Sequence, residues 1–394
     1  MRFPKPALWL ALLGLSTLLL PAMEKMADGV YAEFTTPRGS FVVELNYREC
    51  PMTVASFVGL AEGTIAARQG QPFFTGLKWY RVVPGFVIQS GDPDFEANAN
   101  KEGNTGPYTF PDEFVPGLRH GAAGVLSMAN AGPDTNGCEF FLTLGDDTRL
   151  NYLHSVFGHV FTGLEVLPKI EVNDAFSIKI LRVGEAGRAF KADEATFQEL
   201  RRKAQPYASP ADAPAAALAK AGPGPAAYFD DPAKLLPVEP PRAKNFNFKL
   251  ANYERVTGVK VVARLFASAP TEEEDKVPGA YMRALAEKLG VARSGVVVAY
   301  FASEKDWRIW FGDDLVPRLL GRPVKPGDLR NEGPLHEVKM ALMDTALAQG
   351  DAAFAAQQKA APADKPVPPT QHLKLQTDAL LDALLLRLEP ARHP

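Results

Sequence analysis

"GVLSMANAGPDTNGCEFFLTL", residues 124–144, places small and turn-forming residues between two short apolar runs. The runs at 124–128 and 140–144 are typical of buried strands, and the Asn, Gly, Pro and Asp residues between them favour a turn. Small residues around Ala129 would let another backbone approach closely, beside an aromatic floor at Phe141. The stretch therefore predicts sheet strands next to a site for an apolar ligand.

A second stretch, "LKWYRVVPGFVIQSGDP" at residues 77–93, supplies the polar groups of that site. Alternation along a strand, a turn and a second strand can place Arg81, Phe86 and Gln89 on one face. Together with Phe141, these side chains suit a small apolar ring flanked by peptide groups. The aromatic rings would desolvate the ligand's ring, while the guanidinium and nearby backbone groups would hydrogen-bond its amides. Proline fits this description.

The surrounding sequence is rich in short strand patterns. Residues 30–46 alternate apolar and polar side chains around the turn at 37–39, which predicts a β-hairpin with one buried face. Pro51 opens a helical pattern that Gly63 can end, and a second helix is expected at 164–171. Further strands are expected at 77–83, 86–89, 156–161 and 176–183. Many short strands with few helices predict a closed barrel or a sandwich.

Four segments resemble the cyclophilin family of peptidyl-prolyl isomerases and occur in the family's order. They are WYRVVPGFVIQSGDP, FPDEF, GVLSMANAGPDTNGCEFFLTL and LHSVFGHVFTG. The resemblance covers about residues 27–185 and implies a closed antiparallel β-barrel with two capping helices. It also implies an enzyme that rotates X-Pro bonds in proline-containing polypeptides and assists their folding, with no cofactor and no metal. A catalytically idle binding or scaffold module of the same fold is the alternative.

The resemblance implies a role for individual residues. Arg81 matches the family's catalytic arginine, and its guanidinium would donate to the imide nitrogen in the twisted state. The other matched catalytic residues are Phe86, Gln89, Phe141 and His154. The matched substrate-binding residues are Val87, Met128, Ala129, Asn130 and Leu150. Two positions depart from the family: Glu139 stands where glutamine is common, and Arg149 stands where an aromatic residue usually lines the rim. The loss of that aromatic rim predicts weaker binding of cyclosporin-type inhibitors.

Residues 1–22 predict export. Arg2 and Lys5 precede an apolar run at 7–20 that Pro21 closes, which is the pattern of a secretory signal peptide. No clear cleavage motif follows, so both a cleaved signal and an uncleaved N-terminal anchor are open. The expected location is therefore periplasmic or otherwise extracytoplasmic, with a membrane tether as one form.

The second half of the chain predicts a separate α/β domain. Residues 186–242 are rich in alanine and proline and predict a stiff linker, and residues 243–360 return to apolar patterns. Strands are expected at 259–267, 295–302 and 307–312, and a helix at 281–289. In that order the first two strands would pair in parallel, and the third would pair antiparallel. Residues 253–267 and 281–312 resemble the TPM domain family, which has a comparable strand-helix-strand core. We expect this domain to bind a protein partner.

The tail at 361–394 contains prolines followed by an amphipathic helix at 370–389, which would pack on its own domain or on a partner chain.

The composition of the chain excludes two classes of function or scaffold. The formal charge of −3 gives no basic surface for nucleic acid. Cys50 and Cys138 are the only cysteines, which excludes a disulfide-built scaffold and a multi-thiolate zinc site. Whether the two cysteines form one bridge or remain thiols is open.

Overall fold

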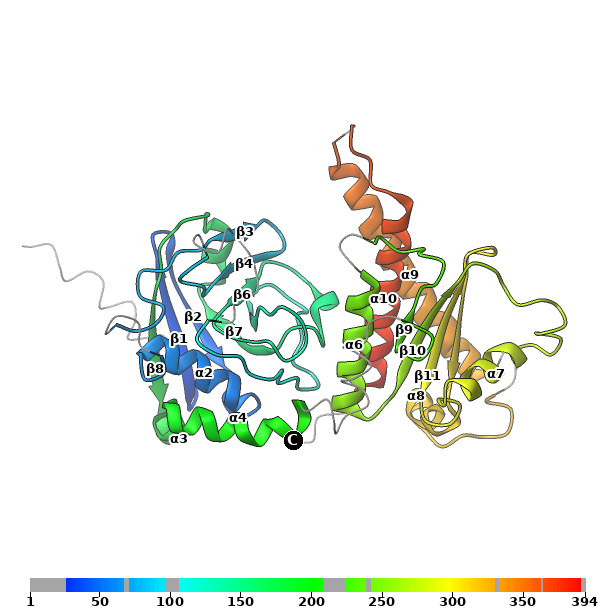
Figure 1. Cartoon of the computed structure of the whole chain (residues 1–394), viewed down its shortest axis with the longest axis horizontal. Coiled ribbons are helices and arrows are strands. Elements are labelled where there is room, and N and C mark those ends of the chain that lie inside the picture. The colour runs from blue at the N-terminus through cyan, green and yellow to red at the C-terminus, as the bar shows by residue number, and fades with distance from the viewer. Residues whose placement is uncertain are drawn as a thin grey trace, which may run out of the picture.

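The protein folds into two domains, each built on its own sheet (Figure 1). The structure is a computed structural model, which describes residues 26–66, 71–95, 106–208, 224–238, 242–329, 333–362 and 364–390. The predicted signal segment at 1–22 lies outside these residues. Within the described ranges, no helix has the length and apolar character needed to cross a membrane.

The N-terminal sheet has eight strands in the order β3-β4-β6-β5-β7-β2-β1-β8, and its strand pairs are antiparallel. The strands are β1 (Gly29–Thr36), β2 (Gly39–Leu45), β3 (Arg81–Val83), β4 (Val87–Ser90), β5 (Val125–Met128), β6 (Phe140–Thr143), β7 (Val156–Thr162) and β8 (Ser177–Val183). The predicted hairpin at 30–46 is confirmed by the pairing of β1 with β2. The other strands of this sheet also form within one or two residues of their predicted bounds, except that the strand predicted at 77–83 forms only at Arg81–Val83.

The sheet is an open half-barrel, so the prediction of a closed barrel is wrong. Its edge strands β3 and β8 are not paired with each other. Just before them, Lys78 and Ala175 form one isolated bridge. Extending this bridge toward β3 would require an extended chain at residue 173, but Asn173 has a φ of 69° and turns the chain away. Arg81, the first residue of β3, therefore lies on a sheet edge.

One long helix and a cluster of aromatic rings fill the concave side of this sheet. The helix α2 (Pro51–Glu62) begins at Pro51 and ends at Gly63, whose φ is 74°. Phe57 packs edge-on against Phe140 of β6, with ring centroids 5.4 Å apart. The helix predicted at 164–171 is instead the 3-10 helix η2 (Leu164–Lys169), which contains Pro168. A second 3-10 helix, η1 (Thr148–Leu150), precedes β7.

The segment at 186–242, predicted as a linker, differs from that expectation at both ends. The helices α3 (Gly184–Ala189) and α4 (Glu194–Ala208) follow β8. Phe197 of α4 is buried against Tyr108 and Phe110 of the N-terminal domain. At the other end, β9 (Phe229–Asp230) joins the C-terminal sheet. These elements were not predicted because alanine and proline dominate the composition of the segment. A single buried ring, Phe197 in α4 and Phe229 in β9, packs each element on its domain.

The C-terminal sheet has the order β12-β11-β10-β9. Its other elements are α6 (Arg242–Thr257), β10 (Val261–Phe266), α7 (Ala280–Lys288), β11 (Val296–Phe301), β12 (Asp306–Phe311), η3 (Asp313–Leu315), α8 (Val316–Leu320), α9 (Pro334–Ala360) and α10 (Pro369–Leu388). The β10–β11 pair is parallel and the β11–β12 pair antiparallel, as predicted. The predicted amphipathic helix is α10, and Leu380, Leu381 and Leu384 lie in the same core as β10 and β11. Its apolar face thus packs on its own domain.

The two domains meet where η1 and the residues after it contact α6 and the end of α10. The ring of Tyr152 lies edge-on to Tyr253 of α6 at 5.1 Å, and Asn252 Nδ2 donates to the Tyr152 carbonyl at 2.8 Å. The Tyr152 hydroxyl donates to Glu389, which directly follows α10. Arg255 of α6 pairs with Asp134 at 3.0 Å. These contacts hold α6 and α10 beside the N-terminal domain (Figure 1).

We expect a C-terminal fragment that begins at residue 224 to be more stable than one that begins at residue 242. Arg264 donates to the carbonyls of Pro225, Ala227 and Tyr228, and Asn247 accepts from the Tyr228 and Phe229 amides. Removing residues 224–241 would break these buried hydrogen bonds, each of which contributes about 0.5–1.5 kcal/mol. Urea unfolding of both fragments measures the difference. Equal midpoints would contradict the expectation.

Candidate active site

The register of the N-terminal sheet brings three residues of the predicted site into one row. Arg81 of β3 is paired with Gln89 of β4, and Gln89 is paired with Phe141 of β6. Directly paired residues project from the same face of a sheet. The guanidinium, the amide and the aromatic ring therefore lie side by side, although the chain separates Arg81 from Phe141 by a long loop region.

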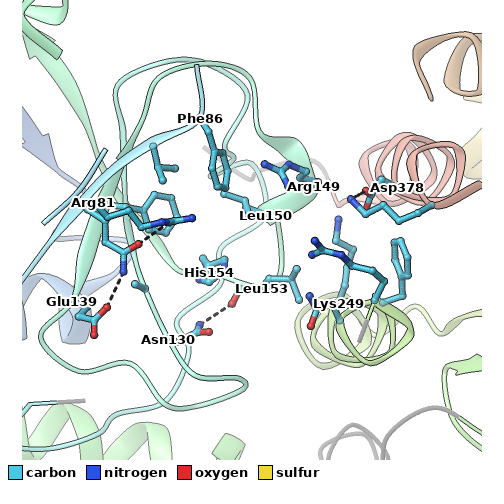
Figure 2. A pocket seen from close by; sticks show the side chains of 18 residues that line it. Arg81, Phe86, Asn130, Glu139, Arg149, Leu150, Leu153, His154, Lys249 and Asp378 are labelled. Atoms are coloured by element: carbon cyan, nitrogen blue, oxygen red, sulfur yellow. Dashed lines mark hydrogen bonds and ion pairs between the residues drawn. The ribbon is translucent and has the colours of Figure 1, made fainter. Parts of the chain in front are cut away.

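These side chains line a cavity of about 320 Å³ (Figure 2). The N-terminal domain contributes Arg81, Phe86, Val87, Gln89, Ala129, Asn130, Glu139, Phe141, Arg149, Leu150, Leu153 and His154. Nine of the ten predicted site residues are therefore brought together. The exception is Met128, whose side chain packs in the hydrophobic core because it projects from the inner face of β5. Its carbonyl still contacts the site, through a hydrogen bond to His154.

A chain of hydrogen bonds fixes the polar side of the cavity. Arg81 Nη1 donates to Gln89 Oε1 at 2.9 Å, and Gln89 Nε2 donates to Glu139 Oε2 at 2.8 Å. Glu139 is buried, with 1% of its surface exposed. Because a carboxylate only accepts, it turns the Gln89 amide so that Oε1 points toward Arg81. Glu139, noted from the sequence only as a departure from the family, thus orients the guanidinium.

Tyr80 is the third hydrogen-bond partner of Gln89, after Arg81 and Glu139. Its hydroxyl lies 3.4 Å from Gln89 Nε2. Burial, together with the neighbouring carboxylate of Glu139, raises the pKa of Tyr80 far above its usual range, so the phenol stays protonated. No pattern in the sequence pointed to Tyr80, because tyrosine is common in strands and beside them.

The apolar side of the cavity is a pocket of rings. Phe141 lies edge-on to His154 at 5.5 Å with an interplanar angle of 87°. The Arg149 guanidinium lies 4.3 Å from the centroid of the Phe86 ring, and Arg81 lies 5.6 Å from the same ring on the cavity side. Leu150 completes the rim (Figure 2). Arg149 therefore covers the ring that an aromatic rim residue would otherwise flank.

Hydrogen bonds on both sides fix the turn between β5 and β6. Asn130 Nδ2 donates to the Leu153 carbonyl at 2.8 Å, and its Oδ1 accepts from the Gly132 amide at 3.3 Å. The Asp112 carboxylate accepts from the Asp134 amide at 2.9 Å. The backbone at 129 and 130 is consequently held as a fixed edge of the cavity rather than as a loose loop.

His154 is a neutral imidazole with a defined tautomer. Its Nδ1 lies 3.0 Å from the Met128 carbonyl oxygen. Burial lowers the pKa of His154 to about 4, so the ring is uncharged at neutral pH. A carbonyl oxygen can only accept, and therefore Nδ1 carries the proton and Nε2 keeps its lone pair.

We expect the His154 ring to stay neutral from pH 8 down to pH 5. Nuclear magnetic resonance of ¹⁵N-labelled histidine should report the Nδ1-protonated tautomer and a pKa of about 4 for His154, well below that of an unperturbed histidine. A midpoint near 6.5 for His154, or a proton on Nε2 at neutral pH, would contradict this assignment.

A second buried histidine supports the pocket from behind. The His120 ring stacks on Phe141 with an interplanar angle of 15°. Its Nε2 lies 2.9 Å from Ser127 Oγ, and its Nδ1 lies 3.0 Å from Asn151 Oδ1. Burial lowers the pKa of His120 to about 3. Its place in the chain, outside the strand patterns, explains why the sequence did not single it out.

The remaining wall of the cavity comes from the C-terminal domain. It consists of Arg242, Asn245, Phe246 and Lys249 from α6, and Lys374 and Asp378 from α10. Figure 2 shows Lys249 and Asp378 across the cavity from Arg81 and Glu139. None of these residues was predicted to belong to the site. The sequence carries no local signal for them, because their position depends on how the two domains dock.

Cys50 and Cys138 are separate buried thiols rather than a disulfide. Cys50 precedes α2, and its sulfur lies 3.3 Å from the Val156 carbonyl oxygen. Burial raises the pKa of Cys138 well above its usual value, so this thiol stays protonated. The alternative of two thiols, left open by the sequence, is therefore the one observed.

Comparisons with known proteins agree with this geometry. The family model for "Cyclophilin type peptidyl-prolyl cis-trans isomerase/CLD" matches residues 31–185. Peptidyl-prolyl cis-trans isomerase A of Mycobacterium tuberculosis is 42% identical over 137 residues, which cover 33% of this chain and 72% of the relative. Peptidyl-prolyl cis-trans isomerase-like 1 of Aspergillus fumigatus is 38% identical over 139 residues, covering 35% and 79%.

Among solved structures, a cyclophilin type isomerase of Cryptosporidium parvum is 26% identical, with a TM-score of 0.33, and covers 39% of this chain and 98% of that chain. Residues 31–185, which the family model matches, include the row of Arg81, Gln89 and Phe141 and the ring pocket beside it. The chain therefore belongs to the cyclophilin-type peptidyl-prolyl cis-trans isomerase family, and its N-terminal domain is the isomerase.

Proposed function

We propose that this isomerase rotates X-Pro bonds in exported proteins and that Arg81 is the group that lowers the rotation barrier. The observation that carries the proposal is the position of Arg81. Its guanidinium lines the cavity beside the ring pocket. It is oriented by its hydrogen bond to Gln89, which in turn donates to Glu139. The guanidinium also lies 5.6 Å from the centroid of the Phe86 ring, on which the proline ring would pack.

The chemistry follows from the peptide bond itself. Resonance gives it a rotation barrier of about 18–20 kcal/mol. When the X-Pro bond twists, the imide nitrogen regains a lone pair that the planar form delocalises. A donor held at that nitrogen stabilises the twisted state more than either planar state. An acceleration of about 10⁵ requires only about 7 kcal/mol, which one charged donor and a desolvating pocket can supply together.

The other residues bind and orient the substrate in this proposal. The proline ring enters the pocket between Phe86 and Phe141, with Val87 and Leu150 around it. The residue before the proline lies along the fixed backbone edge at 129 and 130, where backbone groups can hydrogen-bond its amide. The neutral His154 ring closes the pocket without adding a charge that would repel Arg81.

The activity is tested on the full chain with a short Ala-Pro peptide and nuclear magnetic resonance exchange spectroscopy. We expect acceleration of cis–trans exchange without any added cofactor or metal. Exchange at the uncatalysed rate, with folded protein present, would overturn the proposed mechanism.

Export rests on the segment at 1–22, through its two cations and its apolar run. Fractionation of producing cells, followed by mass spectrometry of the mature N-terminus, tests it. A processed or membrane-bound protein outside the cytoplasm supports the proposal. An intact N-terminus in the soluble cytosolic fraction would overturn it.

We further propose that the C-terminal domain, which resembles the TPM family, binds a protein partner. The domain has an α/β core of its own with a buried hydrophobic cluster. Deleting it should change which clients the protein captures from an extract of exported proteins. Identical capture by the full chain and by the isolated isomerase domain would overturn a binding role.

A further inference from the structure

The cavity wall formed by α6 and α10 carries three cationic side chains and one carboxylate, that of Asp378. It presents Arg242, Lys249 and Lys374, and Arg149 adds a fourth positive charge from the N-terminal side. Figure 2 shows Arg149 and Lys249 on the side of the cavity that faces α6 and α10. A peptide bound in the proline pocket would meet these charges next.

Three of the four cations have a carboxylate partner. Lys249 pairs with Asp382, Lys374 pairs with Asp378, and Arg149 lies 3.3 Å from Asp147. Each of these pairs neutralises one charge of the wall.

Arg242 is different. Within the residues that the structure describes, it makes no hydrogen bond and no ion pair, and it is only partly exposed. Burial lowers its pKa, the carboxylate of Asp378 opposes this effect, and the neighbouring Arg149 adds to it. A guanidinium nevertheless stays charged in proteins. The cavity thus contains a partly desolvated cation, and none of the anions that the structure describes pairs with it at contact distance.

We propose that Arg242, together with Lys374 and Arg149, forms an anion subsite that selects substrates with an acidic side chain on the residue after the proline. Two of its three cations come from the C-terminal domain and Arg149 comes from η1 of the N-terminal domain, and the proposal rests on the substrate orientation proposed above. Its ligand is an anionic side chain, either a carboxylate or a phosphate ester. A guanidinium binds both groups through two parallel hydrogen bonds.

The direction of the bound chain determines which residue is selected. The residue before the proline lies at the backbone edge near Asn130. Figure 2 shows Asn130 and Arg149 on opposite sides of the cavity, with Leu150 and His154 between them. A chain that enters along Asn130 and places its proline ring in the pocket must leave toward Arg149 and α6. The side chain after the proline therefore reaches Arg242.

The experiment measures exchange in matched peptides with the full chain. The series Ala-Ala-Pro-Xaa carries Glu, Gln, Lys or phosphoserine as Xaa. We expect kcat/KM to be about tenfold higher for Glu than for Gln at low ionic strength, mainly through a lower KM. The preference should shrink with added salt, because the subsite is open to solvent on one side. The glutamate and phosphoserine peptides distinguish a carboxylate ligand from a phosphate ligand.

Substitutions of Arg242 test whether this residue causes the preference for glutamate over glutamine after the proline. R242Q should reduce the Glu-to-Gln ratio to near one, R242K should retain part of it, and R242E should favour the Lys peptide. R283Q is the matched control, because Arg283 lies on the exposed face of α7 and pairs with Glu287. It should keep the wild-type ratio. The salt titration of the wild-type chain tests the subsite even where a variant is unstable.

Two outcomes separate the subsite from the activity on which it rests. Equal rates for the Glu, Gln and phosphoserine peptides, all well above the uncatalysed rate, would overturn the anion subsite and leave the isomerase proposal standing. An uncatalysed rate for every peptide would overturn the proposed mechanism itself. A charge preference that survives in R242Q would also overturn the assignment to Arg242.

Discussion

Arg81→Ala will lower kcat/KM for X-Pro isomerisation by about 10²–10³-fold, which corresponds to about 3–4 kcal/mol of lost transition-state stabilisation. The reason is that the guanidinium of Arg81 is the donor, and the hydrogen bonds from Arg81 to Gln89 and from Gln89 to Glu139 hold it beside the pocket. Its stabilisation acts on the twisted state and hardly on the planar substrate. The loss should therefore appear in kcat as well as in kcat/KM.

The fold should tolerate this substitution, because Arg81 lies on the edge strand β3 and is only partly buried. Circular dichroism and the melting temperature check this point. Arg38→Gln is a matched control, since Arg38 pairs with Glu171 and Asp174 outside the cavity. It should leave the rate unchanged. Arg81→Lys should recover little, because an ammonium group cannot reproduce the fork of the guanidinium. A folded Arg81→Ala variant with the wild-type rate would refute the mechanism.

Asp382→Leu will destabilise the C-terminal domain by about 3–5 kcal/mol. Asp382 forms an ion pair with Lys249, whose side chain is 1% exposed. Removing the carboxylate leaves a buried ammonium group without its partner. The double variant Lys249→Met/Asp382→Leu should recover most of the loss, because two apolar side chains of similar length replace the pair.

Native-state hydrogen exchange of peptides from α6 and α10 measures this effect in the full chain. Burial raises the pKa of Asp382 to about 7, against the pull of Lys249. Below that pH the carboxyl becomes neutral and attracts the ammonium group less. The coupling energy from the double-mutant cycle should therefore be larger at pH 8 than at pH 6. A single variant as stable as the double variant would show that the pair contributes nothing.

Much of the isomerase site could be predicted from the sequence, because its information is local. Alternation along residues 77–93 put Arg81, Phe86 and Gln89 on one face, the apolar run at 140–144 placed Phe141 beside them, and the family resemblance added His154. The same kind of pattern predicted the parallel crossover and the amphipathic helix α10 in the C-terminal domain. Strand periodicity and motif spacing predict structure well because residues that are close in the sequence also lie close together in the folded chain.

Features that depend on long-range packing were missed or wrong. The sheet is open because one turn residue, Asn173, directs the chain away from β3. Residues 194–208 form α4 because Phe197 finds a pocket in the N-terminal core, although the composition nearby is typical of a linker. The role of Glu139 became visible only through its hydrogen bond to Gln89.

The sequence by itself thus determined the family, the strand pattern and the residues that surround the proline ring. Only the tertiary structure decided that a second domain completes the cavity. Tyr152 docks against Tyr253, Arg255 pairs with Asp134, and these contacts place Arg242 and Lys374 opposite the ring pocket. Residues so far apart in the chain share no periodicity or motif. Their proximity results from the burial of one interface, and no local pattern in the sequence encodes it.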